Sequence, residues 1–89
     1  MVYVMARHKV ADYAKWRQGF DDAGTMRNSA GEKLTRIFRV VDDPNSVVVF
    51  MEWDSLENAR KHLQSEEVQK TRQEAGVLEP PEIFFLNEA

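Results

Sequence analysis

The chain has 89 residues, of which 43% are hydrophobic and 30% are charged, a composition typical of one globular domain. Its formal net charge of −3 gives no electrostatic reason to expect nucleic acid or an anionic membrane as a partner. The absence of cysteine excludes disulfides, iron–sulfur clusters, thiolate zinc sites and cysteine nucleophiles. No segment resembles a signal peptide or a membrane span of ~20 apolar residues, so we expect a cytoplasmic protein.

The first segment, residues 2–9, alternates in a way that predicts a β-strand, with a small apolar face that ends at His8. Asp12 then provides the short carboxylate that helix N-caps favour. A helix is predicted from there to Gly31, which has the character of a C-terminal stop. The apolar side of this helix contains Tyr13, Trp16, Phe20, Ala23 and Ala30. Arg27 falls among them, where it either snorkels to the rim or meets an acidic partner.

Two strand-like segments follow, residues 34–41 and 47–53, separated by the turn sequence Asp42-Asp43-Pro44-Asn45. They are expected to form a β-hairpin. The second segment is rich in β-branched and aromatic residues and is apolar on both of its faces. Such a strand requires cover on two sides.

Glu52 is the one carboxylate inside that apolar segment, and a buried carboxylate must either pair with a cation or raise its pKa. If Val40 pairs with Val48, Arg36 lies opposite Glu52 and neutralises it. We expect this ion pair. An unpaired Glu52 would instead be available to a ligand as an acid or base.

The C-terminal part of the chain is predicted to be a broken helix followed by a strand. Ser55 is an N-cap candidate, and a second start follows a break near Gln64–Ser65. Gly76 ends the second helical segment, and Glu79-Pro80-Pro81 prevents further helix. The last strand is expected over residues 82–86.

The predicted order is β-α-β-β-α-β, the ferredoxin-like α+β arrangement. Right-handed crossovers place the helices on one face of a four-stranded antiparallel sheet, with the first and third strands central. The other face keeps exposed apolar residues, so sheet-against-sheet homodimerisation is its simplest cover. An RNA-binding module has the same order of elements, but its basic, glycine-containing aromatic signature is missing from residues 47–53.

Several segments resemble a known family: Val10-Ala11-Asp12-Tyr13-Ala14-Lys15-Trp16, Asp42-Asp43-Pro44-Asn45 leading into Val49-Phe50-Met51-Glu52-Trp53-Asp54, and Pro80-Pro81-Glu82. Over nearly the whole chain they resemble small antibiotic biosynthesis monooxygenase-like proteins of the dimeric α+β barrel superfamily. The resemblance implies a ferredoxin-like protomer whose sheet packs on its twin, with a pocket between sheet and helices. Relatives in that group include oxygenases of aromatic polyketides that need no metal or flavin, haem-degrading enzymes and polyketide cyclases.

Of the candidate residues, His8 has the strongest chemical interest, because imidazole titrates near neutrality and can act as a general base. The alternative is a rim histidine bonded to a neighbour. Tyr13, Trp16 and Phe20 form an aromatic stripe that is either the wall of a ligand site or plain core. His62 lies in a polar stretch and is interpreted as solvated helix surface.

The leading hypothesis is a cofactor-independent, monooxygenase-like homodimer that acts on a small aromatic ligand. His8 would deprotonate a phenol and Arg36 or Trp53 would hold an oxyanion, while Glu52 and the aromatic stripe contact the substrate. No spacing of histidines and carboxylates indicates a metal site. The alternatives are a non-catalytic ligand-binding or structural dimer and a polyketide cyclase-like enzyme.

Overall fold

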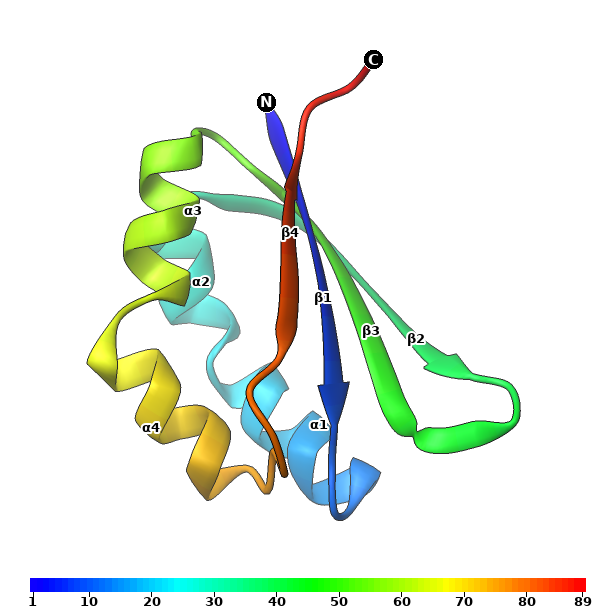
Figure 1. The fold of residues 1–89 in the computed structure, drawn as a ribbon. Helices are drawn as coiled ribbons and strands as arrows, with labels where there is room; N and C mark the ends of the chain where they lie inside the picture. Colours follow the sequence, from blue (N-terminus) through cyan, green and yellow to red (C-terminus); the bar gives the residue numbers. More distant parts are fainter.

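The computed structural model describes all residues from 1 to 89 and contains eight elements. In chain order they are β1 (Val2–Lys9), α1 (Tyr13–Asp22), α2 (Gly24–Ala30), β2 (Glu32–Val40), β3 (Asp43–Trp53), α3 (Leu56–Leu63), α4 (Glu66–Glu74) and β4 (Glu82–Leu86). All neighbouring strands are antiparallel, in the order β2-β3-β1-β4. This confirms the α+β ferredoxin-like prediction, including the central position of the first and third strands. Figure 1 shows the four helices gathered along one face of the sheet and the other face left open.

The hairpin between β2 and β3 has a different register from the one predicted. Val40 pairs with Asp43 across a two-residue turn, and a register shift between Arg39 and Val40 then places Val47 opposite Arg39 and Val48 opposite Phe38. The expected pairing of Val40 with Val48 is therefore wrong by two residues. A shift of two residues preserves which face each side chain occupies, so the predicted inner and outer faces survive the error.

The predicted ion pair between Arg36 and Glu52 depended on that register and does not form. Arg36 lies opposite Phe50, and Glu52 lies opposite Leu34. No salt bridge joins the two side chains, although both lie on the open face of the sheet.

The long helix predicted from Tyr13 to Ala30 is two helices that meet at Ala23. The carbonyl oxygen of Phe20 accepts a hydrogen bond of 2.6 Å from Nη1 of Arg27, so a side chain takes the acceptor that a continuous helix would offer to Gly24. Glycine at position 24 also weakens the helix at this point. The predicted caps are confirmed: Asp12 accepts from the amide of Lys15, and Gly31 ends α2 with a φ of 127°.

The hydrophobic core lies between the helices and the inner face of the two central strands. The core residues on these strands are Val2, Val4, Val47, Val49, Met51 and Trp53, each at most 6% exposed. Paired positions alternate between inner and outer faces. His8 pairs with Val47 at one end of this inner face, so an imidazole continues the apolar row.

The C-terminal half confirms the predicted break, since α3 ends at Leu63 and α4 begins at Glu66. The Ser65 hydroxyl oxygen accepts a hydrogen bond from the amide of Val68 and donates one to the carbonyl of His62, which fixes the angle between the two helices. No helix is long and apolar enough to cross a membrane.

Candidate functional site

A small cavity lies between the inner face of the sheet and all four helices. Its volume is about 70 Å³, and ten of its 16 lining residues are hydrophobic. They include Ala6, Trp16, Phe20, Val49, Met51 and Leu63. A water needs roughly 10–15 Å³ measured in this way, whereas sites for drug-sized ligands occupy roughly 300–1,000 Å³. The cavity therefore has room for a few waters, and a larger ligand requires the surrounding helices to give way.

His8 brings the most reactive side chain to this cavity. It is 6% exposed, and its Nδ1 has no hydrogen-bond partner. Its ring centroid lies 5.9 Å from that of Trp16. Burial, and then the positive charge of Arg72, lower the pKa of His8 to about 4. At neutral pH the imidazole is therefore uncharged and able to accept a proton.

A second histidine, His62, lines the same cavity from α3. Its ring centroid is 5.3 Å from that of Trp53, and burial followed by the charges of Arg27 and Arg72 lowers its pKa. The interpretation of His62 as solvated helix surface is wrong. The available signal was its position three residues after Ala59, on the side of the helix that faces the core.

Arg72 reaches the cavity from the last turn of α4. Its side chain is partly buried, and Nη2 donates a hydrogen bond of 3.2 Å to the carbonyl oxygen of Leu63. No carboxylate lies within ion-pair distance of it, and burial lowers the pKa of its guanidinium. The sequence alone indicates no functional role for Arg72.

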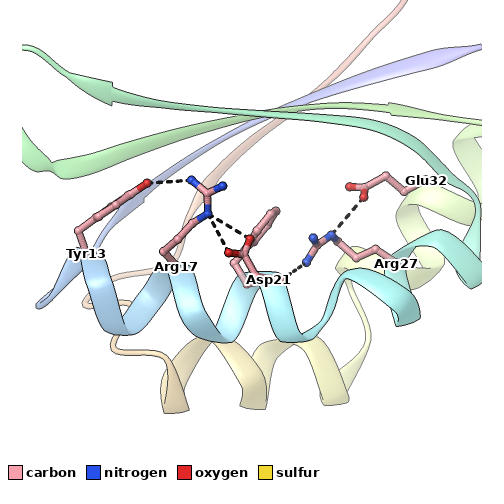
Figure 2. Close-up of polar contacts among 6 residues, drawn as sticks. Tyr13, Arg17, Asp21, Arg27 and Glu32 are labelled. Atoms are coloured by element: carbon pink, nitrogen blue, oxygen red, sulfur yellow. Dashed lines mark hydrogen bonds and ion pairs between the residues drawn. The ribbon is translucent and has the colours of Figure 1, made fainter.

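The other guanidinium at the cavity, that of Arg27, contacts a carboxylate, a backbone carbonyl and an aromatic ring. Its Nε donates to Oε1 of Glu32 at 3.2 Å, and its guanidinium carbon lies 3.6 Å from the ring centroid of Phe20. Figure 2 shows Arg27 extending from α2 toward Glu32 at the start of β2. Of the two alternatives left by the sequence, the structure shows the acidic partner.

The remaining predicted site residues divide between the inside of the protein and its open face. Trp16 and Phe20 line the cavity and stack on each other with centroids 5.0 Å apart. Tyr13 does not line it: its hydroxyl accepts from Nη1 of Arg17, as drawn in Figure 2. Trp53 is fully buried beyond His62, with an unpartnered Nε1.

Arg36 and Glu52 lie on the far side of the sheet from the cavity, as their strand positions require. The structure therefore separates them from His8 and brings Arg72 and His62 in their place. Nowhere in the chain do three or more His, Cys, Asp or Glu side chains come together in a way that could hold a metal ion.

Comparison of the chain with models of known protein families gives a match. The family model described as antibiotic biosynthesis monooxygenase matches residues 1–74. No curated protein matches the chain.

Solved structures with the same fold cover nearly all of the chain. A Bordetella bronchiseptica protein assigned to the antibiotic biosynthesis monooxygenases is 19% identical, with a TM-score of 0.82 over 99% of this chain and 96% of its own. A variant of SnoaB, a cofactor-independent oxygenase from Streptomyces nogalater, is 18% identical, with a TM-score of 0.76 over 98% of this chain and 91% of its own. Rv0793 from Mycobacterium tuberculosis is also 18% identical, with a TM-score of 0.74 over 99% of this chain and 94% of its own. At these identities the likeness shows a shared fold.

Proposed function

Because the chain belongs to the antibiotic biosynthesis monooxygenase family, we propose that it is a cofactor-independent oxygenase of a small phenolic substrate, with the cavity beneath its helices as the active site. One observation carries this proposal. His8 is buried in the cavity, uncharged at neutral pH, and has a ring nitrogen without a partner. Nearly all buried polar groups in proteins are hydrogen-bonded, so an unpaired imidazole nitrogen at a cavity is a candidate for function.

In the proposed mechanism His8 removes the proton of a phenol. Before substrate binds, the His8 imidazole with its pKa near 4 is a weak base, since a general base works best with a pKa near the operating pH. The phenolate that forms raises the pKa of His8, because a nearby negative charge favours the protonated imidazole. Arg72, whose charge is not compensated, stabilises the same phenolate from the other side.

The phenolate is in resonance with a carbanion on the ring, and this carbon forms a bond to molecular oxygen. The resulting peroxide anion takes the proton held by His8 and becomes a hydroperoxide. Cleavage of the O–O bond with loss of the hydrogen on that carbon leaves a carbonyl and releases water. One oxygen atom enters the product, the other leaves as water, and the substrate carbon supplies the electrons.

Trp16 and Phe20 form the aromatic wall against which a flat substrate would lie. Arg27 holds that wall in place through its contact with the Phe20 ring and its pair with Glu32. Outside the cavity, the Tyr13 ring packs beside Trp16 and the Trp53 ring packs beside His62, and we assign neither a contact with substrate.

The test is oxygen uptake with hydroxynaphthoquinone-type and anthrone-type phenols, in chelator and without added flavin. The proposal predicts that His8→Gln lowers kcat about 10²–10⁴-fold, the usual contribution of a general base. Lys61→Gln, on the exposed side of α3, is the matched control and keeps the wild-type rate. Equal rates for wild type and His8→Gln would remove the base from the mechanism.

A second candidate is a dimer that binds a ligand without reaction or has only a structural role. The cavity of about 70 Å³ favours it, because that space is smaller than a polycyclic substrate. Under this alternative no phenol is consumed, and neither the wild type nor His8→Gln shows oxygen uptake.

We also propose that two copies associate through the open face of the sheet. Several large apolar side chains there are exposed: Phe38 at 52%, Phe84 at 48%, Leu34 at 40% and Met5 at 38%. Leu34 and Phe38 lie on β2, Met5 on β1 and Phe84 on β4. Val48 and Phe50 of β3 lie between them, paired with Phe38 and Met5, so apolar side chains extend across the sheet. A contiguous apolar patch of this kind marks an interaction surface, and a second copy offers a matching one.

A further inference from the structure

The charges around the cavity do not balance. Its lining contains two guanidiniums, Arg27 and Arg72, and two histidines, but no carboxylate. Arg27 is neutralised by Glu32 at 3.2 Å. The histidines are uncharged at neutral pH because burial lowers the pKa of each. One uncompensated positive charge remains, that of Arg72.

Arg72 also lies where the cavity meets a larger surface groove. This outer groove lies between α4 and the segment 77–83 and has a volume of about 520 Å³. Leu63 and Arg72 line both the cavity and the outer groove. The groove wall also contains the uncharged hydrogen-bonding side chains of Gln64, Gln69 and Gln73. Its one carboxylate, that of Glu79, is exposed to solvent and forms no ion pair with Arg72. A ligand with one end in the cavity and the other in the groove would pass directly beside the guanidinium of Arg72.

Two side chains that line the cavity, His8 and Arg72, have hydrogen-bonding groups without partners. Nδ1 of His8 is buried with nothing to bond, and the only bond of the Arg72 side chain is to the Leu63 carbonyl. A guanidinium has five N–H donors in a planar fork that matches the two oxygens of a carboxylate. Most of these donors are unused in this structure.

We propose that the site takes an aromatic monocarboxylate, with the ring in the cavity against Trp16, the carboxylate on Arg72, and any polar extension in the outer groove. A single uncompensated cation favours a monoanion over a phosphate dianion, and the guanidinium fork favours a planar acid. The inference deepens the proposed function, on which it rests for the identity of the site, by giving its substrate class an acidic group.

The experiment compares benzoate with benzamide, which share a planar ring and differ in charge. Dissociation constants are measured by NMR titration without oxygen, so no turnover is required. We expect benzoate to bind the wild type about tenfold or more tightly than benzamide, since a hydrogen-bonded charge contributes at least that ratio. Benzoate should shift the ring signals of His8 and His62.

Arg72→Gln should bring the ratio of the two dissociation constants close to one. Lys70→Gln is the matched control, because it removes the same charge from an exposed position of the same helix; it keeps the wild-type ratio. Equal affinity of the wild type for both probes overturns the inference, as does a benzoate preference that survives in Arg72→Gln. If that variant fails to fold, the wild type still decides, because benzoate binding that leaves the His8 and His62 rings unshifted also overturns it.

The result separates this inference from the proposed oxygenase. Benzoate preference without oxygen uptake on any phenol leaves an acid-binding site and removes the oxygenase. Oxygen uptake with neutral phenols, together with equal binding of the two probes, leaves the oxygenase and removes the acid-binding site.

Discussion

At the scale of single residues, the buried pair of Arg27 and Glu32 contributes most to the shape of the site. Their side chains are 10% and 3% exposed, and the pair joins α2 to the start of β2. Glu32→Gln leaves the guanidinium of Arg27 buried without a compensating charge. We predict a loss of about 3–5 kcal/mol in the free energy of unfolding, the usual cost of breaking a buried pair.

Urea unfolding measures this loss, and a surface pair provides the control. Arg17 and Asp21 form an ion pair on α1 with side chains 44% and 56% exposed, visible beside the buried pair in Figure 2. Asp21→Asn should cost about 1 kcal/mol or less, because solvent screens exposed pairs. Equal losses for Glu32→Gln and Asp21→Asn would show that the Arg27–Glu32 pair is not buried in solution.

The sequence predicted part of the site. His8 was identifiable because strand alternation places it on the same face as Val4 and Ala6, and Trp16 because helical spacing puts it on the core side. The role of Arg72 was not identifiable, because it depends on how two short helices pack over the sheet. His62 was missed although its spacing from Ala59 places it on the core side of α3. The pairing of Arg36 with Glu52 was wrong because it depended on a register two residues away from the observed one.

At the scale of elements, two glycines end helices with positive φ angles but in different surroundings. Gly31 has a φ of 127°, and a Cβ there would lie 2.4 Å from Oδ1 of Asp54. Gly76 has a φ of 84°, and its nearest neighbour would be 3.8 Å away. Gly31→Ala therefore meets both backbone strain and a clash, whereas Gly76→Ala meets strain alone.

We predict that Gly31→Ala lowers the free energy of unfolding by about 2–3 kcal/mol and Gly76→Ala by about 1 kcal/mol. Chemical denaturation of the two variants measures both values. A loss for Gly76→Ala that equals or exceeds that for Gly31→Ala would contradict the geometry at the start of β2.

The elements themselves were largely predictable because local signals agreed with the fold. The capping side chains of Asp12, Ser55 and Ser65 all accept the amide hydrogen bonds expected of them. The division between α1 and α2 was missed because it depends on a tertiary contact, the bond from Arg27 to the Phe20 carbonyl. Helical periodicity continues through that position, and Gly24 weakens a helix there without by itself ending it.

At the scale of the whole molecule, the open face of the sheet predicts the state of assembly. A chain of 10.3 kDa that associates through this face should have twice that mass by light scattering at micromolar concentration. Phe84→Glu places a carboxylate beside Met5 in the proposed contact and should give a monomer. Val41→Glu, at an apolar position 95% exposed in the hairpin turn, is the control and should remain dimeric. A monomeric wild type would contradict the proposed dimer.

The pH dependence of stability follows from the burial of His8 between the helices and the sheet. Burial lowers the pKa of His8 from 6.5 to about 4, so between these values the unfolded chain binds more protons than the folded one. Stability attributable to His8 is therefore complete above pH 6.5 and declines as the pH falls toward 4, by up to about 3 kcal/mol. His8→Gln should lose less stability over this range than the wild type does.

The central claim is that His8 is buried and uncharged at the cavity, and NMR titration of its ring signals tests this most directly. The structure predicts that His8 is neutral at pH 7 and becomes half protonated near pH 4. A midpoint at or above the ordinary value of about 6.5 would show a solvated or paired imidazole, and would contradict the burial of His8.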